Sequence, residues 1–594
     1  MVFALAFAAV GRATAAIPNE ALAREPSAFL KSLANSPVRW MTWGEPAFSR
    51  ARTEQKPIFV FMGFATSELS RAMAQQTFAN AKTSDWLNQH FVCVAVDREE
   101  RPDLAALYQA YIEDVKQLNG WPLNLWLTPE LLPFDGAAYL SPSEEWGAPG
   151  FLKQAKQALD AWEGDPRVCR KRAAEAVSQL RPPAKYAQIA WSPERSDKRL
   201  AAGTDAWRDS FDAANGGFSE PPKMPEPELV RFLLGREAVD HEAALKTLRV
   251  LAESAVRDPL DGGFFRYATD ATWHIPYTQK LLTDQARIAL AYLDAARGPD
   301  AASFEQCARG ALDFALARLG HGDGSFAASI DATGTAFAGT YVWTAAEIER
   351  VLGPDAAAFE RAHGVEAAGN VAASDDPSGV YVGKNFLRAT ATVDRASAAQ
   401  AARLLAARDR RPAPPRGERA TVGAQGLMLA ALAQAGEQLH EPRYSLAAKR
   451  ALGALRKAFL RSSAGDLSRI AESPENASPA DYGAFALGCR GYALASGDKG
   501  AAALADRLLL RMDALYYDPV TRRFFAAPDT ARPGVFVRPF AVGEPLAPES
   551  LVIFARPAPD RARNLAGGLL DSLDESNAQA PGDQLLALAV FAAR

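Results

Sequence analysis

Two apolar segments and the turn between them most constrain the fold of this chain. Residues 57–62 and residues 91–96 are apolar runs of about strand length. The turn Gly63-Phe64-Ala65-Thr66 follows the first run, and Ser67-Glu68-Leu69-Ser70 then leads into a predicted helix. A second helix and a strand that begins at Pro122 follow the second run. This order of strands and helices predicts an α/β domain.

The order is typical of a thioredoxin-like core, with a further strand expected near residues 137–140 and a closing helix over Pro149–Glu163. A thioredoxin carries Cys-x-x-Cys in the turn after the first strand, where this chain has Ser67 and Ser70. Thiol–disulfide exchange needs a thiolate and a second thiol, and serine supplies neither. We therefore expect no redox activity at this loop. The serines are interpreted as helix caps, with binding of an anion or a peptide carbonyl at the helix N-terminus as the alternative.

Composition excludes several classes of protein and of site. At 594 residues the chain exceeds one hydrophobic core, and its net charge of -4 and pI of about 6.0 do not suggest a nucleic-acid partner. The cysteines (Cys93, Cys169, Cys307 and Cys489) are far apart, and no two histidines stand four residues apart. We expect buried thiols, no metal site and no cofactor.

The first residues resemble an export signal. Residues 2–10 form an apolar run, and Ala13-Thr14-Ala15 offers a small-residue cleavage pattern, although no basic residue precedes the run. We expect a leader over residues 1–18 and a periplasmic or secreted protein. A plain leader and a cytoplasmic protein is the alternative. No later segment is apolar for long enough to cross a membrane.

Helical periodicity dominates after residue 197. About twelve amphipathic helices are predicted, separated by turns such as Asp261-Gly262-Gly263-Phe264 in which a glycine precedes an aromatic residue. Such hairpins predict an (α/α)6 toroid with a central funnel, and an open solenoid is the alternative. An insert near residues 331–410 interrupts the pattern, with short strands expected at 341–343 and 380–382.

The expected organisation is therefore multidomain. A leader over 1–18 precedes an α/β thioredoxin-like domain over 19–164, a connection over 165–197 and an all-α toroid over 198–594.

Several motifs resemble the thioredoxin-domain-containing family that includes spermatogenesis-associated protein 20 and bacterial homologues. The motifs that carry this resemblance occur in both predicted domains: residues 22–27, 96–103, 120–124, 262–264, 266–267, 284–286, 341–344, 383–385 and 481–482. The resemblance implies a thioredoxin-like domain followed by an (α/α)6 domain akin to six-hairpin glycosidases and N-acylglucosamine 2-epimerases. It also implies a cis peptide bond at Pro122.

The chain departs from the family pattern at chemically important positions. The family has Cys-His-Trp-Cys-His where this chain has Ser67-Glu68-Leu69-Ser70-Arg71, and Pro-His-Phe-Glu-Lys where it has Pro276-Tyr277-Thr278-Gln279-Lys280. A histidine before Arg-Tyr is replaced by Phe265, and Glu-Asp-Ala-Asp becomes Ile330-Asp331-Ala332-Thr333. Trp-Asn-Gly becomes residues 424–426, Ala-Gln-Gly. The sequence is thus that of a divergent member without the Cys-x-x-Cys.

The candidate site residues follow from both the residues and the resemblance. Ser67, Ser70 and Pro122 mark the degenerate thioredoxin loop, and no catalytic residue is nominated. The candidate toroid pocket contains the aromatic and charged residues Arg266, Tyr267, Asp270, Trp273, Tyr277, Lys280, Asp284, Asp331, Asp481 and Tyr482. For the aromatic residues core packing is an equal alternative, and for the aspartates capping or ion pairing is.

Three functions are consistent with these features. The first is a redox-inactive protein that binds a carbohydrate-like or other small polar ligand in the toroid without turnover. The second is a sugar-modifying enzyme that uses Asp284, Asp331 or Asp481 as proton-transfer groups. The third is an interaction module that holds a peptide in the vacant thioredoxin groove.

Overall fold

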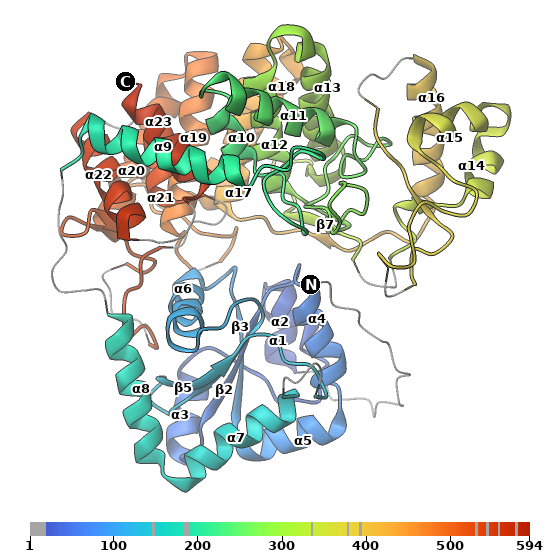
Figure 1. Ribbon diagram of the computed structural model, residues 1–594. Coiled ribbons are helices and arrows are strands. Elements are labelled where there is room, and N and C mark those ends of the chain that lie inside the picture. The colour runs from blue at the N-terminus through green and yellow to red at the C-terminus, as the bar shows by residue number, and fades with distance from the viewer. Residues whose placement is uncertain are drawn as a thin grey trace.

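The computed structural model describes residues 19–144, 149–181, 190–333, 337–376, 379–390, 395–473, 475–528, 533–541, 546–555, 559–575 and 580–593. The expected leader over residues 1–18 lies outside the described residues. The chain forms an α/β domain, drawn below in Figure 1, and a helical domain above it. Among the described helices, none is long and apolar enough to cross a membrane.

A mixed five-stranded sheet, in the order β1-β3-β2-β4-β5, organises the lower domain. Its strands are β1 (Met41–Thr42), β2 (Ile58–Gly63), β3 (Val92–Asp97), β4 (Leu123–Leu127) and β5 (Pro133–Ala137). Strand β2 pairs in parallel with β3 and antiparallel with β4, which is a thioredoxin-like arrangement. The helices around the sheet are α1 (Glu20–Arg24), α2 (Ala28–Ser32), α3 (Glu45–Glu54), α4 (Glu68–Ala72), α5 (Ala81–His90), α6 (Pro102–Ala110), α7 (Phe151–Gly164) and α8 (Pro166–Leu180).

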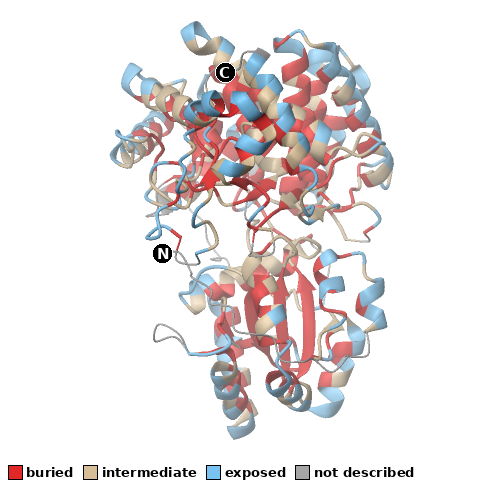
Figure 2. Ribbon diagram, turned by 90° about the vertical axis from the view of Figure 1, so that its right-hand side faces the viewer, coloured by how far each residue is buried: buried red, intermediate tan, exposed pale blue. Residues whose placement is uncertain are grey.

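Alternation along β2 places apolar side chains on both faces of the sheet. Phe59 and Phe61 pack into one core, and Val60 and Met62 pack into the other. Figure 2 shows the strands buried beneath helices that expose their outer faces. Continuous apolar runs are typical of strands covered on both sides, which explains why β2 and β3 were predictable.

Some local predictions for this domain were wrong. The last strand, β5, ends at Ala137 and does not cover residues 137–140. The helix predicted after Thr66 begins after Ser67 and changes at Met73 into a π-helix, η1 (Met73–Thr77). Helix α6 likewise continues as η2 (Tyr111–Val115). Helix α8, in the expected connection, packs against β5 and η2.

Six inner helices form a closed ring in the upper domain. Each contacts the next, and the last contacts the first, in the order α10, α12, α17, α19, α21 and α23. Six outer helices lie against this ring, so the domain is an (α/α)6 toroid and not the open solenoid. The inner helices are α10 (Pro227–Leu233), α12 (Leu282–Ala295), α17 (Val422–Gln438), α19 (Pro479–Ser496), α21 (Pro548–Phe554) and α23 (Gly582–Ala592). The outer helices are α9 (Pro193–Asp209), α11 (Ala238–Ala252), α13 (Ala301–Phe314, continued by the π-helix η4, Ala315–Leu319), α18 (Pro442–Phe459), α20 (Lys499–Tyr516) and α22 (Pro559–Glu575).

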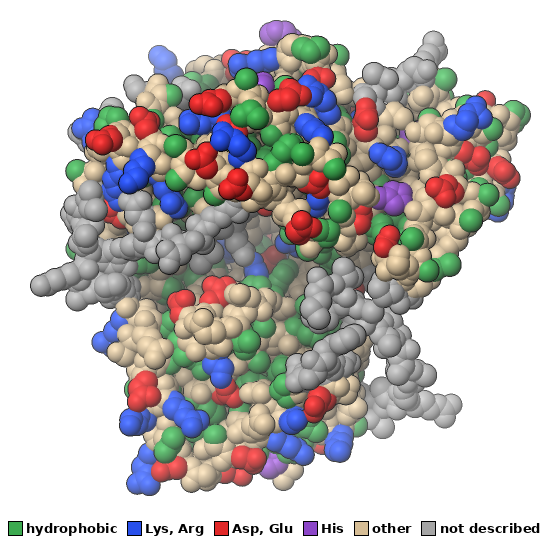
Figure 3. Space-filling model, viewed as in Figure 1, with side chains coloured by type: hydrophobic (Ala, Val, Ile, Leu, Met, Phe, Trp, Pro, Cys, Tyr) green, Lys and Arg blue, Asp and Glu red, His purple; other side chains and the backbone are tan. Residues whose placement is uncertain are grey.

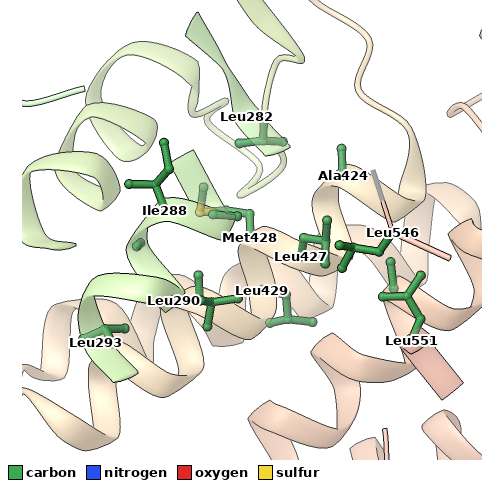
Figure 4. Close-up of a cluster of buried hydrophobic side chains, with 14 of the residues drawn as sticks. Leu282, Ile288, Leu290, Leu293, Ala424, Leu427, Met428, Leu429, Leu546 and Leu551 are labelled. Carbon is green, nitrogen blue, oxygen red and sulfur yellow. The ribbon is translucent and has the colours of Figure 1, made fainter. Parts of the chain in front are cut away.

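Aliphatic side chains from neighbouring inner helices fill the core of the toroid. Figure 4 shows Leu290 and Leu293 of α12 near Leu427 and Leu429 of α17. Helices α17 and α19 approach unusually closely, because a Cβ at Gly426 would lie 2.6 Å from the backbone of α19. Glycine is therefore required at this position of the ring.

A small three-stranded sheet lies at the end of the toroid that faces the lower domain. It is formed by β6 (Gln279–Leu281), β7 (Ser329–Asp331) and β10 (Arg416–Gly417), in the order β10-β7-β6. Helix α12 begins at Leu282, directly after β6. A short hairpin, β11 (Tyr517–Asp518) and β12 (Arg523–Phe524), follows α20.

The insert forms a lobe with its own small core, visible at the right of Figure 1. Its helices are α14 (Ala345–Leu352), α15 (Ala356–His363) and α16 (Arg395–Arg408). Strand β8 (Val342–Trp343) was predicted, but its partner is β9 (Asn385–Phe386). The strand expected at residues 380–382 is instead a bend and turn, because the Tyr381 amide donates to the Asp376 carboxylate.

A buried network of four charges fastens this lobe to the toroid. Lys280 Nζ lies 2.8 Å from Asp258 and 2.7 Å from Asp261. Arg408, the last residue of α16, lies 2.6 Å from each of the same two carboxylates. Because all four side chains are buried, removing one cation would leave a carboxylate short of a partner.

We predict that Arg408→Ala lowers the free energy of unfolding of the toroid by about 3 kcal/mol, because it breaks a buried ion-pair network. Chemical denaturation followed by circular dichroism measures this change. Arg403→Ala, on the same helix, removes an exposed ion pair with Asp355 and should cost less than about 1 kcal/mol. Equal losses in the two variants would contradict a structural role for the network.

Candidate functional site

The degenerate thioredoxin loop is the part of the lower domain that meets the toroid. Helix α4 and the turn before it face β7 across the domain boundary (Figure 1). Figure 3 shows the surface hollowed between the two domains on the side that faces the viewer. The loop and the toroid sheet therefore form a shared boundary at which residues from both predicted sites come together.

Ser67 and Ser70 have different roles in this loop. Ser67 is the N-cap of α4, and its Oγ accepts a hydrogen bond of 3.1 Å from the Ser70 amide. The interpretation of Ser67 as a cap is confirmed. Ser70 does not cap the helix: its Oγ is buried and has no hydrogen-bond partner among the described residues. A cysteine pair is thus replaced by one structural hydroxyl and one unsatisfied hydroxyl.

The cysteines offer no replacement thiol. All four are buried and free, and burial was predicted for Cys93, Cys307 and Cys489. Cys93 lies in β3, where burial raises the pKa of its thiol to about 12. A thiol with such a pKa is protonated near neutral pH and is a poor nucleophile.

The other edge of the loop region keeps thioredoxin-like features. The Trp121–Pro122 peptide bond is cis, as the resemblance implied. The Arg98 guanidinium lies between two rings, 4.5 Å from the centre of Phe64 and 4.4 Å from that of Trp121. This stack occupies space beside the cis proline.

Arg71 binds the loop to the toroid sheet. Its guanidinium donates to the Asp331 carboxylate at 2.7 Å and to the Thr333 hydroxyl at 2.6 Å. It also donates to the Ala65 carbonyl of its own loop at 2.8 Å. The candidate Asp331 is therefore an interdomain ion-pair partner. Its second oxygen accepts hydrogen bonds from Thr333.

Gln279 and Tyr277 make the next contacts between the domains. Gln279 is fully buried, donates to the Thr66 carbonyl at 2.9 Å and accepts from Arg266 at 3.2 Å. The Tyr277 hydroxyl donates to the Glu68 carboxylate at 3.3 Å. Burial raises the pKa of Glu68 above its ordinary value. Burial and the nearby Glu68 charge raise the pKa of Tyr277, so its hydroxyl stays protonated.

The two candidate tyrosines form one aromatic platform. The rings of Tyr267 and Tyr277 stack with centroids 4.7 Å apart and planes 9° from parallel. The Tyr267 hydroxyl makes no hydrogen bond to any of the described residues and is not enclosed. It is available to a ligand as both donor and acceptor.

Asp284 lies in the first turn of α12, within the electrostatic range of Arg266. One of its oxygens, Oδ2, is buried and has no hydrogen-bond partner among the described residues. The nearest cation, Arg287, is 3.8 Å away and is committed to Glu228. Burial raises the pKa of Asp284 above its ordinary value. A buried acceptor without a donor is costly, and protonation of the carboxyl group, which the raised pKa favours, lowers this cost.

We call these residues the interdomain cluster: Glu68, Arg71, Arg266, Tyr267, Tyr277, Gln279, Asp284 and Asp331. The cluster contains five of the ten toroid candidates. Glu68, Arg71 and Gln279 were missed. The signal for them was present, because all three stand at positions where the chain departs from the family motifs.

Three other candidates serve the structure and lie outside the cluster. Asp270 accepts hydrogen bonds from the amides of residues 272, 274 and 275, so it stabilises a turn. Trp273 is fully buried, and its indole donates to the Asn215 carbonyl. Lys280 belongs to the buried network that holds the insert.

The last two candidates lie at the start of α19. Asp481 forms a capping box with Ser478 and an ion pair of 2.5 Å with Arg469. The Tyr482 hydroxyl accepts a hydrogen bond from the Leu467 amide. Both therefore support the alternative roles of capping and packing.

A second set of contacts fixes the domains at the far side of the loop. Glu100 pairs with Arg419 at 2.8 Å, and Arg469 donates to the Glu99 carbonyl. Asp97, at the end of β3, is buried here, and burial followed by the charge of Glu99 raises its pKa to about 7. Among the described residues, no group of three histidine, cysteine or acidic side chains is arranged to hold a metal ion.

Comparison with known proteins finds a matching family and several curated relatives. Residues 19–181 match the family Thioredox_DsbH, described as a protein of unknown function, DUF255. Spermatogenesis-associated protein 20 of Homo sapiens is 31% identical over 471 residues, which are 72% of this chain and 59% of the human protein. An uncharacterised protein of Caenorhabditis elegans is 30% identical over 486 residues, covering 75% of this chain and 66% of that protein. The chain thus spans less than two thirds of the length of these curated relatives.

Solved structures match this chain at low sequence identity. A D-mannose isomerase is 12% identical, with a TM-score of 0.37, and covers 68% of this chain and 87% of its own. The cellobiose 2-epimerase of Spirochaeta thermophila is 12% identical, with a TM-score of 0.29, and covers 64% and 98%.

The two loop serines should respond oppositely to alanine. Ser67→Ala removes the N-cap of α4 and should lower the free energy of unfolding by about 1 kcal/mol. Ser70→Ala removes a buried hydroxyl that has no partner and should raise it by about 1 kcal/mol. Thermal unfolding of the two variants side by side measures the difference, and a loss of stability in Ser70→Ala would show that its hydroxyl is satisfied.

Proposed function

The chain is a relative of spermatogenesis-associated protein 20 with a DUF255 domain over residues 19–181, and on this premise we propose that it is a redox-inactive binding protein. Its ligand is a small, hydroxyl-rich molecule of carbohydrate type, held without turnover at the interdomain cluster. The observation that carries this proposal is the Asp284 oxygen without a partner, within the electrostatic range of Arg266, the residue that precedes Tyr267 of the tyrosine platform.

The loop chemistry supports redox inactivity. Ser67 is engaged as a helix cap, Ser70 is buried, and neither forms a disulfide. The loop is also occupied by its own chain, since Thr66 and Arg71 already bind toroid residues. This occupancy disfavours the alternative of a peptide held in a vacant groove.

The free groups of the cluster match a polyol better than an anion. The Tyr267 hydroxyl and the Arg266 guanidinium supply donors, and Asp284 and Glu68 supply acceptors. Each hydroxyl of a sugar donates one hydrogen bond and accepts others, so it satisfies both kinds of group. A sugar acid would place its negative charge beside the carboxylates of Asp284 and Glu68. The cations near them, Arg287 and Arg71, are already paired with Glu228 and Asp331.

The interdomain cluster has few side chains that are suited to transfer a proton. Gln279 cannot carry a proton, and the Tyr277 hydroxyl stays protonated. Asp331 is committed to Arg71, and Asp481 is committed to Arg469. Asp284 alone among the candidate aspartates supports the alternative of a sugar-modifying enzyme, because a carboxyl group with a raised pKa suits a general acid.

The absence of redox activity is testable in the unaltered protein. We predict that the full chain does not accelerate the reduction of insulin by dithiothreitol above the rate in buffer, because no described thiol is accessible. Turbidity of the insulin B chain measures the rate. An acceleration that disappears in Cys93→Ser would show that a buried thiol becomes exposed, and would contradict the proposal.

Ligand binding is tested with a panel of neutral monosaccharides and disaccharides, sugar acids and short peptides. Thermal shift selects ligands, and titration calorimetry measures their affinity. We predict binding of a neutral sugar, and a loss of about tenfold in affinity in both Tyr267→Phe and Asp284→Asn, because each removes one hydrogen bond. Tyr492→Phe, on α19, is the matched control and should leave the affinity unchanged.

The same panel separates binding from catalysis. Chromatography of each sugar after incubation should recover it unaltered. Conversion that is lost in Asp284→Asn, and that falls as the pH rises through the raised pKa of Asp284, would replace the binding proposal by the enzyme. The fall is the expected sign, since a general acid must be protonated to act.

A further inference from the structure

The thioredoxin-like domain carries a groove that shares no residue with the interdomain cluster. It lies where α7, α8, η2 and the edge strand β5 meet, and its volume is about 500 Å³. Figure 1 places these elements on the lower left of that domain. We call it the α7–α8 groove.

Small apolar residues form part of the lining of this groove. Ala158 of α7 and Ala176 of α8 are buried, and Phe134 of β5 is 7% exposed. The short alanine side chains leave room between the two helices. The apolar part of a small molecule can be buried against these residues.

A fixed polar network forms one wall. Lys116 lies 2.7 Å from one oxygen of Asp135, and Gln154 donates to the other at 3.0 Å. The Gly136 amide also donates to Asp135 at 2.9 Å. The Asp135 carboxylate therefore has three hydrogen-bond donors. The Lys116 ammonium donates to it with one of its three N–H groups, which leaves two for a ligand.

Tyr111 presents to the groove a hydroxyl that is not fully enclosed. Its side chain is 2% exposed and lines the groove, and its hydroxyl has no hydrogen-bond partner among the described residues. Burial, and then the charge of Asp135, raise the pKa of this hydroxyl, so it stays a donor near neutral pH. Tyr111 also begins the π-helix η2, a type of irregularity that is frequent at functional sites.

We propose that the α7–α8 groove binds a small monocarboxylate with a short apolar body. The Tyr111 hydroxyl and the Lys116 ammonium donate to the carboxylate oxygens, and the apolar body covers Phe134 and the two alanines. Arg172 on the rim adds positive charge. Asp135 and Glu175 also line the groove, and their charges disfavour a dianion such as a phosphate monoester.

Isocaproate and its primary amide test the proposal with the full chain. The two probes share an apolar body and differ in charge. Titration calorimetry should show isocaproate binding at least about tenfold more tightly than isocaproamide, because hydrogen bonds to a charged group are the stronger ones. Equal affinity of the two probes, or no binding of the acid, overturns the proposal.

Two variants locate the site. Tyr111→Phe keeps the buried ring and removes only the hydroxyl, and it should weaken isocaproate binding about tenfold, as should Lys116→Met. Lys153→Met, on the exposed face of α7, is the matched control and should bind as the unaltered protein does. Unchanged affinity in Tyr111→Phe with an unchanged melting curve overturns the assignment, and if that variant fails to fold, unchanged affinity in Lys116→Met does so.

Discussion

The ion pair between Arg71 and Asp331 fixes the relation between the two domains. It joins residues 260 positions apart, and the side chains beside it, Gln279 and Tyr277, repeat the same connection. Because the toroid covers the loop at Thr66 and Arg71, a redox-active cysteine in this loop would face the toroid and not a substrate in solution. The loop is therefore part of the boundary between the domains, which also contains the Tyr267 hydroxyl and the Asp284 carboxylate of the toroid.

The structure also explains why two regions of the sequence depart from the family motifs together. The substitutions at residues 67–71 and those at 276–280 and 330–333 are far apart in the chain. In space Glu68 meets Tyr277, and Arg71 meets Asp331 and Thr333. The departures at Glu68, Arg71, Tyr277 and Thr333 therefore meet in one contact between the domains, in which Arg71 also pairs with Asp331, an acid that the motif retains.

The sequence was sufficient for the architecture and insufficient for the site. The twelve toroid helices follow from helical periodicity, and β2 and β3 follow from runs buried on both faces, since both signals are local. The site depends on distant neighbours: Asp284 and Asp481 stand at similar helix starts, yet Asp481 is neutralised by Arg469 whereas Asp284 keeps a free oxygen. The prediction of a strand at residues 380–382 was wrong for a similar reason, because a hydrogen bond from the Tyr381 amide to the Asp376 carboxylate imposes a turn that propensity does not predict.

Closure of the ring has a consequence for how the protein is made. Helix α10 begins at Pro227, and the helix that completes its contacts, α23, begins at Gly582. During synthesis the apolar face of α10 therefore lacks its contact with α23 until more than half of the chain has been made after it. Such late, long-range closure slows folding and leaves hydrophobic surface uncovered in the meantime. The thioredoxin-like domain is made early and is built mainly from nearby segments, but Val535, Phe536 and Val537, which pack against its cores, are also made late.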